Sequence, residues 1–548
     1  MKNPHKILEM IKIKYILLTC ISAVILSGFN TYKSDFFEIA KQIEIFTALY
    51  KEINMNYVDE VNPAELMDVA ITNMLSDLDP YTNFYNEQDV EEARINKSAS
   101  YANLGLKLQK QKEEVIITDL TKDFAADQSG LKLGDKILSI DGTRIENFSE
   151  NLGEILNGTP NTSVNLEILR NGQTTNIELK RSMSKQTSVP FYGMADEETG
   201  YIVLSKFSRS ASKDVGLALL ELKEKGAEKI ILDLRKNPGG LLSEAVNVSN
   251  LFLPKDQLIT YTKSQIKDYN VSYATRNEPI DTEIPLTVLI NERSASASEI
   301  VSGSLQDLDR AVIIGARSFG KGLVQRPKPL KYGTQVKITI SRYFLPSGRG
   351  IQALEYKDGK SIRKSIANSQ AFKTKNDRTV YDGGGIKPDI EIEAEQISDF
   401  TQQLIDNLII FEFATDYYYD NPNVEWQSFE VDNKIFSDFI DFVEKGNYEI
   451  NVETDNKLLE VISAAESDNL DPKFIEDLNE LKEKLKVEKM KLFETYKVQI
   501  SALLTDQIIK HYAYEEGIYK HNLENAEVIE KALATLNDKK AYRKILGY

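Results

Sequence analysis

The chain has 548 residues, of which 41% are hydrophobic and 28% are charged, and its formal net charge is -17. This length exceeds what one hydrophobic core supports, so we expect roughly three or four domains. The negative charge argues against a nucleic-acid-binding protein, because contacts with phosphates need clustered Lys and Arg.

The N-terminus has the pattern of an export signal. Four lysines, at positions 2, 6, 12 and 14, precede an apolar run from Tyr15 to Phe29. This run fits the core of a signal peptide better than a membrane span of about twenty residues. We therefore expect an exported protein of the periplasm or cell envelope, in which residues 1–34 form either a cleaved signal peptide or a retained membrane anchor. A buried N-terminal helix of a cytosolic protein is the alternative.

The single cysteine, Cys20, lies inside this segment. Leu18-Thr19 precede it and the apolar run continues beyond it, which is not the pattern of a lipoprotein signal. An exported chain would then hold no thiol, which excludes disulfides, cysteine catalysis and cysteine-based zinc sites.

Residues 35–98 read as an N-terminal helical region. Ile39, Ile43 and Phe46 recur at three- and four-residue steps, which is typical of a helix. A second helix is predicted from Pro63, a suitable first helical residue, to Leu75.

Residues 99–184 have a β-rich pattern. Three strand-sized apolar runs, 115–117, 136–140 and 164–168, alternate with the turn-forming pairs Gly134-Asp135, Asp141-Gly142 and Asn171-Gly172. The spacing predicts a compact module.

Residues 185–396 alternate strands and helices. Ile230–Leu234 and Leu286–Ile290 are continuous apolar runs, as expected for strands that are covered on both faces. A layered α/β domain is predicted.

Residues 397–548 are predicted to be helical. One amphipathic face is expected to carry Leu404, Leu408 and Phe411. A second face is expected to carry Phe474, Leu478, Leu481 and Leu485. These helices form either an ordinary helical domain or a surface for a second copy or an adaptor protein.

The chemistry of the chain is first limited by its histidines. There are three, at positions 5, 511 and 521, and the last two lie in the C-terminal helical region. A Ser-His-Asp triad would have to recruit one of these from an unrelated domain. No Gly-x-Ser-x-Gly motif occurs, which argues against an α/β-hydrolase. We therefore expect a serine enzyme with this sequence to use a lysine as its base.

Two segments supply such a pair. The strand that ends at Ile290 is followed by a run of small residues from Ser294 to Ser298, which opens a helix. Unpaired N–H groups at a helix N-terminus can stabilise an oxyanion, although serines there also serve as simple caps. Further on, Lys321 stands between two glycines, and Gln325 offers it a neutral partner. A lysine acts as a base only if burial lowers its pKa to about 7–8; a solvated loop lysine is the alternative.

A third segment, Asp233 to Gly240, follows a buried strand and ends in two glycines. It is either a plain turn or the source of a second oxyanion donor.

Together and in this order, the three segments resemble those of the carboxyl-terminal-processing (tail-specific) serine proteases. The resemblance extends over residues 36–393 and includes the motifs at residues 78–82 and 385–390. It implies that Ser296 is the nucleophile and Lys321 its general base. By the same resemblance, Gln325 orients the lysine, and the N–H groups of Ala297 and Gly240 form the oxyanion hole. It implies a core of the crotonase/ClpP-like α/β type and requires no metal or other cofactor.

The β-rich module resembles a PDZ domain, in which Leu104, Gly105 and Leu106 match the carboxylate-binding loop. Such domains add a peptide as an extra strand. The expected partners are therefore proteins or peptides with free C-termini. The expected function is a serine endopeptidase that cleaves substrates near their C-termini. A catalytically idle PDZ scaffold and acyl-CoA chemistry on a crotonase-like core are the rivals.

Overall fold

The computed structural model describes residues 32–90, 104–147, 156, 158–182, 187–357, 360–365, 369–393, 397–446, 448 and 450–548. The expected export signal, including Cys20, lies outside these ranges. The chain forms two compact units, Met1–Phe84 and Tyr85–Tyr548. Among the described helices, none combines the length and the apolar character that a membrane crossing needs.

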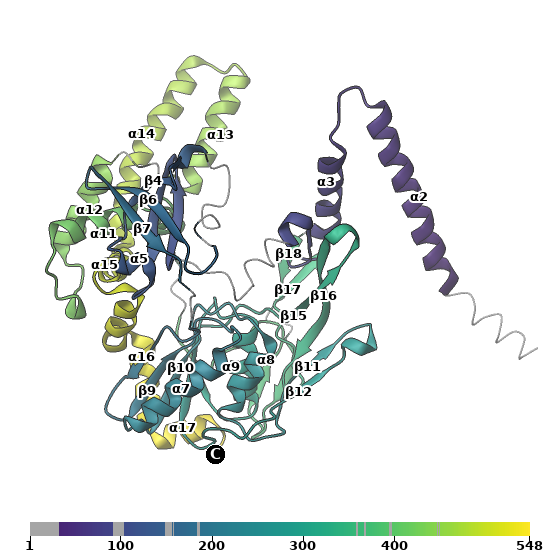
Figure 1. Cartoon of the computed structure of the whole chain (residues 1–548), viewed down its shortest axis with the longest axis vertical. Helices are drawn as coiled ribbons and strands as arrows, with labels where there is room; N and C mark the ends of the chain where they lie inside the picture. Colours follow the sequence, from purple (N-terminus) through teal and green to yellow (C-terminus); the bar gives the residue numbers. More distant parts are fainter. Residues whose placement is uncertain are drawn as a thin grey trace, which may run out of the picture. The chain divides into compact units, whose positions relative to one another are not determined.

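Among its described residues, the first unit contains two helices, α2 (Tyr32–Asn56) and α3 (Pro63–Ser76), drawn in purple in Figure 1. The predicted start of the second helix at Pro63 is confirmed. The side chain of Asn62 caps this helix, because its Oδ1 accepts the N–H of Ala64 at 3.0 Å. Proline suits the first helical position, where its missing N–H would have no helical partner. A short strand, β1 (Asn83–Tyr85), lies at the boundary with the second unit.

The described residues of the β-rich module form one sheet of six strands. Its order is β2-β3-β4-β6-β7, and β5 pairs with β4. The predicted strand at 136–140 has the bounds of β4, and the runs at 115–117 and 164–168 lie within β3 and β6. The elements are β2 (Leu106–Gln111), β3 (Glu114–Leu120), α5 (Ala125–Gln128), β4 (Lys136–Ile140), β5 (Thr143–Arg144), η1 (Ile145–Asn147), β6 (Ser163–Arg170) and β7 (Gln173–Lys180).

A second six-stranded sheet forms the centre of the α/β domain, with the order β21-β14-β13-β10-β9-β8. All neighbouring pairs are parallel except β8 with β9. Every residue of β10 and β13 is buried, which confirms that strands at these apolar runs are covered on both faces. The strands are β8 (Phe191–Met194), β9 (Thr199–Val203), β10 (Lys229–Asp233), β13 (Leu286–Ile290), β14 (Val312–Gly315) and β21 (Ile390–Glu391).

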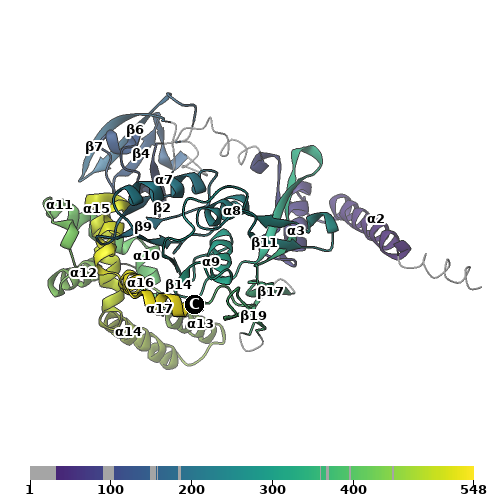
Figure 2. The same ribbon diagram turned by 90° about the horizontal axis from the view of Figure 1, so that it is seen from below.

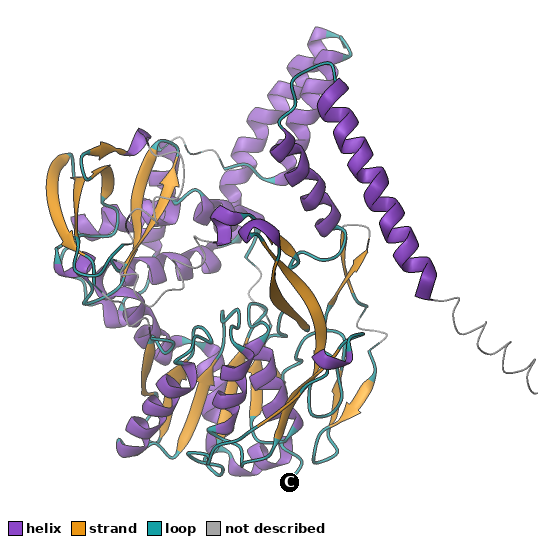
Figure 3. Ribbon diagram, turned by 45° about the vertical axis from the view of Figure 1, so that its right-hand side comes forward, coloured by secondary structure: helices purple, strands orange, loops and turns teal. Residues whose placement is uncertain are grey.

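Different parts of the chain cover the two faces of this sheet. Helices α7 (Ala211–Glu224), α8 (Leu242–Asn250) and α9 (Ala297–Asp307) share one apolar cluster with the sheet. Figure 3 shows strands of this domain beside helices. The other face packs against α16 (Glu527–Asn537) and α17 (Lys539–Ile545), from the far end of the chain. Figure 2 shows both helices, in yellow, near β14.

A smaller antiparallel sheet and two hairpins complete the α/β domain. The sheet pairs β15 with β16, β16 with β11, and β11 with β12. The hairpins pair β17 with β18 and β19 with β20. The elements are β11 (Leu258–Lys263), η2 (Lys267–Tyr269), β12 (Ser272–Ala274), β15 (Leu323–Pro329), η3 (Lys331–Gly333), β16 (Gln335–Phe344), β17 (Leu354–Lys357), β18 (Lys360–Arg363), β19 (Ala371–Lys373) and β20 (Thr379–Tyr381).

The C-terminal region is helical, as predicted, but one expected face is wrong. Leu408 has a left-handed backbone (φ 55°) that separates α10 from α11. Leu404 therefore packs in the core of the helical region, whereas Leu408 and Phe411 pack against the β-rich module. The second expected face lies on one helix, α14, where Phe474 and Leu481 are about half exposed. The elements are α10 (Asp399–Asp406), α11 (Ile409–Asp420), η5 (Trp426–Ser428), α12 (Asn433–Lys445), α13 (Glu453–Ser467), α14 (Pro472–Thr495) and α15 (Lys497–Asn525).

Candidate active site

Ser296 lies at the junction between β13 and α9. It is the N-cap residue of α9, and its backbone has a φ of 56° and a ψ of -111°. A non-glycine residue with positive φ is uncommon, and holding it there costs about 1–3 kcal/mol. The Ser296 N–H donates to Oε2 of Glu299 at 2.8 Å, which holds this conformation. The serine thus stands where the first N–H groups of the helix have no helical acceptor.

The loop at residues 237–240 packs against this helix N-terminus. The Asn237 carbonyl accepts the Ala295 N–H at 3.0 Å and the Ser298 hydroxyl at 2.9 Å. A Cβ at Gly239, where φ is 98°, would lie 2.9 Å from both the Ala297 nitrogen and the Ser296 Cβ. Only glycine therefore allows the loop to approach the serine this closely.

The two glycines of this loop differ in how their N–H groups are used. The Gly239 N–H donates to Oδ1 of Asn237 at 2.9 Å. Neither the Gly240 N–H nor the Ala297 N–H has a backbone acceptor among the loop, turn and cap contacts of the described residues. Gly240 is exposed, whereas Gly239 is buried. The geometry therefore favours Gly240 over Gly239 as a donor to a bound oxyanion.

Glu299 ties the serine segment to the lysine segment. Its side chain is fully buried, and each carboxylate oxygen accepts two hydrogen bonds. Oε1 accepts the Ser318 hydroxyl at 2.6 Å and the Gly320 N–H at 2.7 Å. Oε2 accepts the N–H groups of Ser296 at 2.8 Å and Lys321 at 2.9 Å. Burial raises the pKa of Glu299 to about 7, while the four hydrogen bonds favour the charged form and oppose this rise.

Tyr343 joins the same two residues from β16. Its hydroxyl donates to the Lys321 carbonyl and lies 3.2 Å from the Ser296 carbonyl. The ring is buried, with 2% of its surface exposed. Glu299 thus accepts the backbone N–H groups of Ser296 and Lys321. Tyr343 contacts the backbone carbonyls of the same two residues.

Lys321 is half-buried between two closely packed glycines. A Cβ at Gly320 would lie 2.3 Å from the Ala353 Cβ, and one at Gly322 would lie 2.9 Å from the Gln352 nitrogen. The Gly322 N–H also donates to Oε1 of Gln352 at 2.6 Å. The backbone on both sides of the lysine is therefore fixed.

Gln325 lies on β15, at a register shift opposite Thr339. Its Nε2 donates to Oγ1 of Thr339 at 3.2 Å. Its role in orienting Lys321 stays a prediction.

A buried ion pair supports the base of the Gly240 loop. Asp233 ends β10, and its carboxylate accepts the Arg235 guanidinium and, at 2.6 Å, the Tyr201 hydroxyl. Burial lowers the pKa of Arg235, but the Asp233 carboxylate outweighs this effect and raises it above the ordinary value. The ion pair anchors the start of the segment that leads to Gly240.

The predicted carboxylate-binding loop of the β-rich module lies at the start of β2. Leu104 is buried, and its carbonyl accepts the Ala126 N–H at 2.9 Å. A Cβ at Gly105, where φ is 75°, would lie 2.4 Å from the Phe124 Cβ. Leu106 begins β2, which pairs with β3 alone in the described sheet. An edge strand of this kind can accept an added peptide strand.

Three family models match successive parts of the chain. The model of peptidase family S41 matches residues 198–358, which contain Ser296, Lys321 and the Gly240 loop. The chain carries an S41 peptidase domain. A PDZ domain model matches residues 102–180, and a model of the C-terminal helical domain of PDZ-proteases matches residues 400–536. The likeness to this class of PDZ-containing serine protease is thus confirmed.

Relatives of the chain include proteins described as "Probable CtpA-like serine protease". One from Staphylococcus haemolyticus (strain JCSC1435) is 30% identical over 57% of this chain and 63% of its own length. One from Staphylococcus aureus (strain MRSA252) is 30% identical over 58% of this chain and 63% of its own length. The chain therefore matches slightly less than two thirds of each relative.

Solved structures similar to the chain include the photosystem II D1 C-terminal processing protease and the tricorn protease. The first is 24% identical and covers 64% of this chain and 93% of its own, with a TM-score of 0.36. The second is 14% identical and covers 54% of this chain and 27% of its own, with a TM-score of 0.28.

Proposed function

We propose that the protein is a serine endopeptidase of the carboxyl-terminal-processing type, with Ser296 as nucleophile and Lys321 as general base. The observation that supports this most is the shared acceptor: one oxygen of the buried Glu299 binds the N–H groups of both residues. Because the two backbone segments are held in this way, the Cα positions of Ser296 and Lys321 are fixed relative to each other. A nucleophile and its base require such fixed positions.

In the proposed reaction, neutral Lys321 takes the hydroxyl proton of Ser296, whose Oγ attacks a peptide carbonyl. The N–H groups of Gly240 and Ala297 donate to the oxyanion that forms. Lys321 then gives its proton to the leaving amine, and the C–N bond breaks. Water hydrolyses the acyl-enzyme and restores the serine. The PDZ domain would bind the free C-terminus of the substrate through residues 104–106.

The boundaries 1–34, 35–98, 99–184, 185–396 and 397–548 remain our proposed domain limits. We likewise propose export to the periplasm or cell envelope through the N-terminal segment. The C-terminal helices are proposed to serve as a surface for an adaptor or a second copy.

The function is tested with purified protein and a peptide that ends in apolar residues. Wild type should cleave it near the C-terminus, and Ser296→Ala and Lys321→Ala should not. Lys321→Arg should also be inactive, since arginine cannot provide a neutral base. Lys331→Ala, which changes an exposed lysine of η3, serves as the matched control and should retain activity. Full turnover by Lys321→Ala would remove the lysine from the mechanism, and no turnover by wild type would favour an idle scaffold.

A further inference from the structure

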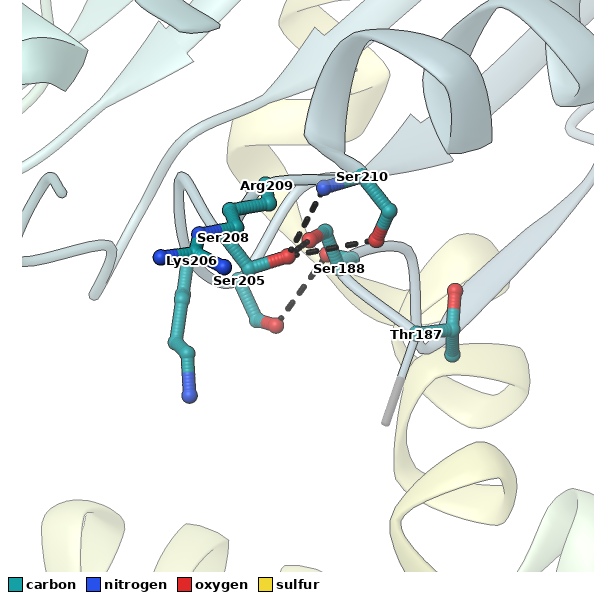
Figure 4. A pocket seen from close by; sticks show the side chains of 7 residues that line it. All are labelled: Thr187, Ser188, Ser205, Lys206, Ser208, Arg209 and Ser210. Atoms are coloured by element: carbon teal, nitrogen blue, oxygen red, sulfur yellow. Dashed lines mark hydrogen bonds between the residues drawn. The ribbon is translucent and has the colours of Figure 1, made fainter. Parts of the chain in front are cut away.

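A cavity of about 430 Å³ lies beside the Gly240 loop. Residues 187–188, 205–206 and 208–210 line it (Figure 4). Five of its seven lining residues carry a hydroxyl, and the other two are Lys206 and Arg209. None of these described lining residues is acidic. The volume falls within the range of sites that hold small ligands or parts of larger ones.

The cavity wall pairs directly with the candidate oxyanion loop. Phe207, between Lys206 and Ser208, donates its N–H to the Gly239 carbonyl at 3.0 Å and accepts the Leu241 N–H at 2.9 Å. Phe207 is buried, and side chains alternate in an extended segment. Lys206 and Ser208 therefore face away from Phe207 and toward the cavity. A substrate whose carbonyl oxygen meets the Gly240 N–H would have its neighbouring residues beside this wall.

The hydroxyl groups form a chain that ends on one carboxylate. The hydroxyl oxygens of Ser188 and Ser208 are 2.5 Å apart, and those of Ser208 and Ser210 are 3.2 Å apart (Figure 4). Asp214, behind this wall on α7, accepts the Ser188 N–H at 2.9 Å and the Ser210 hydroxyl at 2.8 Å. Asp214 thus binds polar groups of the wall from behind, while the charged residues among the described lining are Lys206 and Arg209. Such a lining suits an anionic group that accepts hydrogen bonds.

We propose that this cavity is a carboxylate subsite next to the scissile bond, and that Lys206 and Arg209 are specificity-determining residues. The proposal rests on the proposed function, because a peptide substrate supplies the carboxylate. Two sources share this chemistry: an Asp or Glu side chain near the cleaved bond, and the terminal carboxylate of a substrate cut close to its end.

The test uses peptides that carry one Asp, moved one position at a time across the cleavage site, each paired with the same peptide carrying Asn. At one position, Asp should raise kcat/KM about tenfold over Asn, since charge-assisted hydrogen bonds exceed neutral ones. In the Lys206→Gln/Arg209→Gln double variant this ratio should fall to about one. The matched control is Lys225→Gln, which removes an exposed charge at the other end of α7, about 21 Å along the helix; it should keep the ratio.

The second arm compares a free C-terminus with an amidated one. An effect of amidation that disappears in the double variant assigns the cavity to the terminal carboxylate. An effect that persists there belongs to the PDZ domain. A charge-reversed Lys206→Glu/Arg209→Glu variant should prefer Lys over Asn at the position where wild type prefers Asp, and this gain of preference cannot come from misfolding.

This design distinguishes failure of the proposed subsite from failure of the proposed function. If wild type cleaves the Asp and Asn peptides equally at every position and ignores amidation, or if its preference survives in the double variant, the subsite is refuted while the protease stands. If no peptide is cleaved, or if Ser296→Ala cleaves them equally well, the proposed function itself fails.

Discussion

Oε2 of Glu299 accepts the backbone N–H of Lys321 at 2.9 Å, and the same oxygen accepts the N–H of Ser296 at 2.8 Å. The two candidate catalytic residues are far apart in sequence but share one acceptor. A buried carboxylate with four donors is costly to disturb, since each hydrogen bond to a charged group contributes about 1.5–3 kcal/mol. Glu299 is therefore a positioning residue for both.

Glu299→Gln should reduce kcat/KM at least about a hundredfold. The amide nitrogen of Gln cannot accept a hydrogen bond, so two of the four donors around this side chain would lose their acceptor. Cleavage of the peptide is measured together with the thermal midpoint. The matched control is Asp307→Asn, which changes another buried acid about 12 Å further along α9, where it binds Arg349. This control should lower stability but keep kcat/KM within a few-fold; an equal loss in both variants would reduce Glu299 to a general structural role.

The pH dependence of stability should also report on Glu299. Its pKa of about 7 lies above its ordinary value of 4.5, so the folded chain holds this proton more tightly than the unfolded chain. The resulting stability is fully present below about pH 4.5 and is lost as the pH rises to about 7, by roughly 3 kcal/mol. The stability advantage of wild type over Glu299→Gln should therefore narrow over this range. If the thermal midpoints of wild type and Glu299→Gln change in parallel from pH 4.5 to 7.5, this expectation is contradicted.

Tyr343→Phe should lower kcat/KM about five- to tenfold. The change removes a hydroxyl that donates to the Lys321 carbonyl and lies close to the Ser296 carbonyl, and one such bond contributes about 1 kcal/mol. Tyr261→Phe, on the neighbouring strand β11, removes a hydroxyl from the same sheet and should leave kcat/KM unchanged. An unaltered rate in Tyr343→Phe would mean that Glu299 alone positions the two segments.

Much of the fold could be predicted from local patterns. The strand Leu286–Ile290 was predicted with its observed bounds, because a largely apolar run between Pro285 and Asn291 leaves little choice. The break at Leu408 could not be predicted, since no Gly or Pro marks it and a leucine adopts the left-handed backbone there. Packing of Leu408 and Phe411 against the PDZ domain accompanies this break, and that contact joins segments remote in sequence.

The candidate site also contains residues that could be predicted from the sequence and residues that could not. Residues 294–298 and 320–322 were found from their composition, and their spacing agreed with a family pattern. Glu299 was missed, although a Glu three residues after an N-cap serine is a known helix-start signal. Its other partners, Ser318, Gly320 and Lys321, reach it only after the chain returns through β14. Tyr343 carries no sequence signal at all, because its contacts arise from the pairing of β15 with β16.

Gly239→Ala should abolish most peptide cleavage, with a loss of about a hundredfold or more. The added Cβ would lie 2.6 Å from the Ala295 carbonyl and 2.9 Å from the Ser296 Cβ, so the serine must move. The matched control is Gly226→Ala, at nearly the same φ, where a Cβ would have no neighbour within 4 Å. Both variants bear similar backbone strain, of roughly 1–3 kcal/mol, but only Gly239→Ala disturbs the site. Equal kcat/KM in the two variants would separate the Gly239 loop from catalysis.

Acid should loosen the contact between the helical domain and the PDZ domain through His511. Burial lowers the pKa of this imidazole to about 4, from an ordinary value of 6.5. The ring packs against Phe411, and its Nε2 lies 3.0 Å from Oγ1 of Thr415. Because the unfolded chain binds this proton more readily, the stabilisation is complete above about pH 6.5 and is lost as the pH falls toward 4, by about 3 kcal/mol.

Hydrogen exchange in α11 and α15 should therefore be faster at pH 5 than at pH 7, after correction for the intrinsic rate. In His511→Phe, which keeps an aromatic ring but cannot be protonated, this additional acid sensitivity should disappear. Thr415→Val removes the hydroxyl partner but keeps the titrating imidazole, so it should keep the acid sensitivity. If hydrogen exchange in α11 and α15 of His511→Phe at pH 5 is as fast as in wild type, another group must bind the proton, because the phenylalanine ring has no site for it.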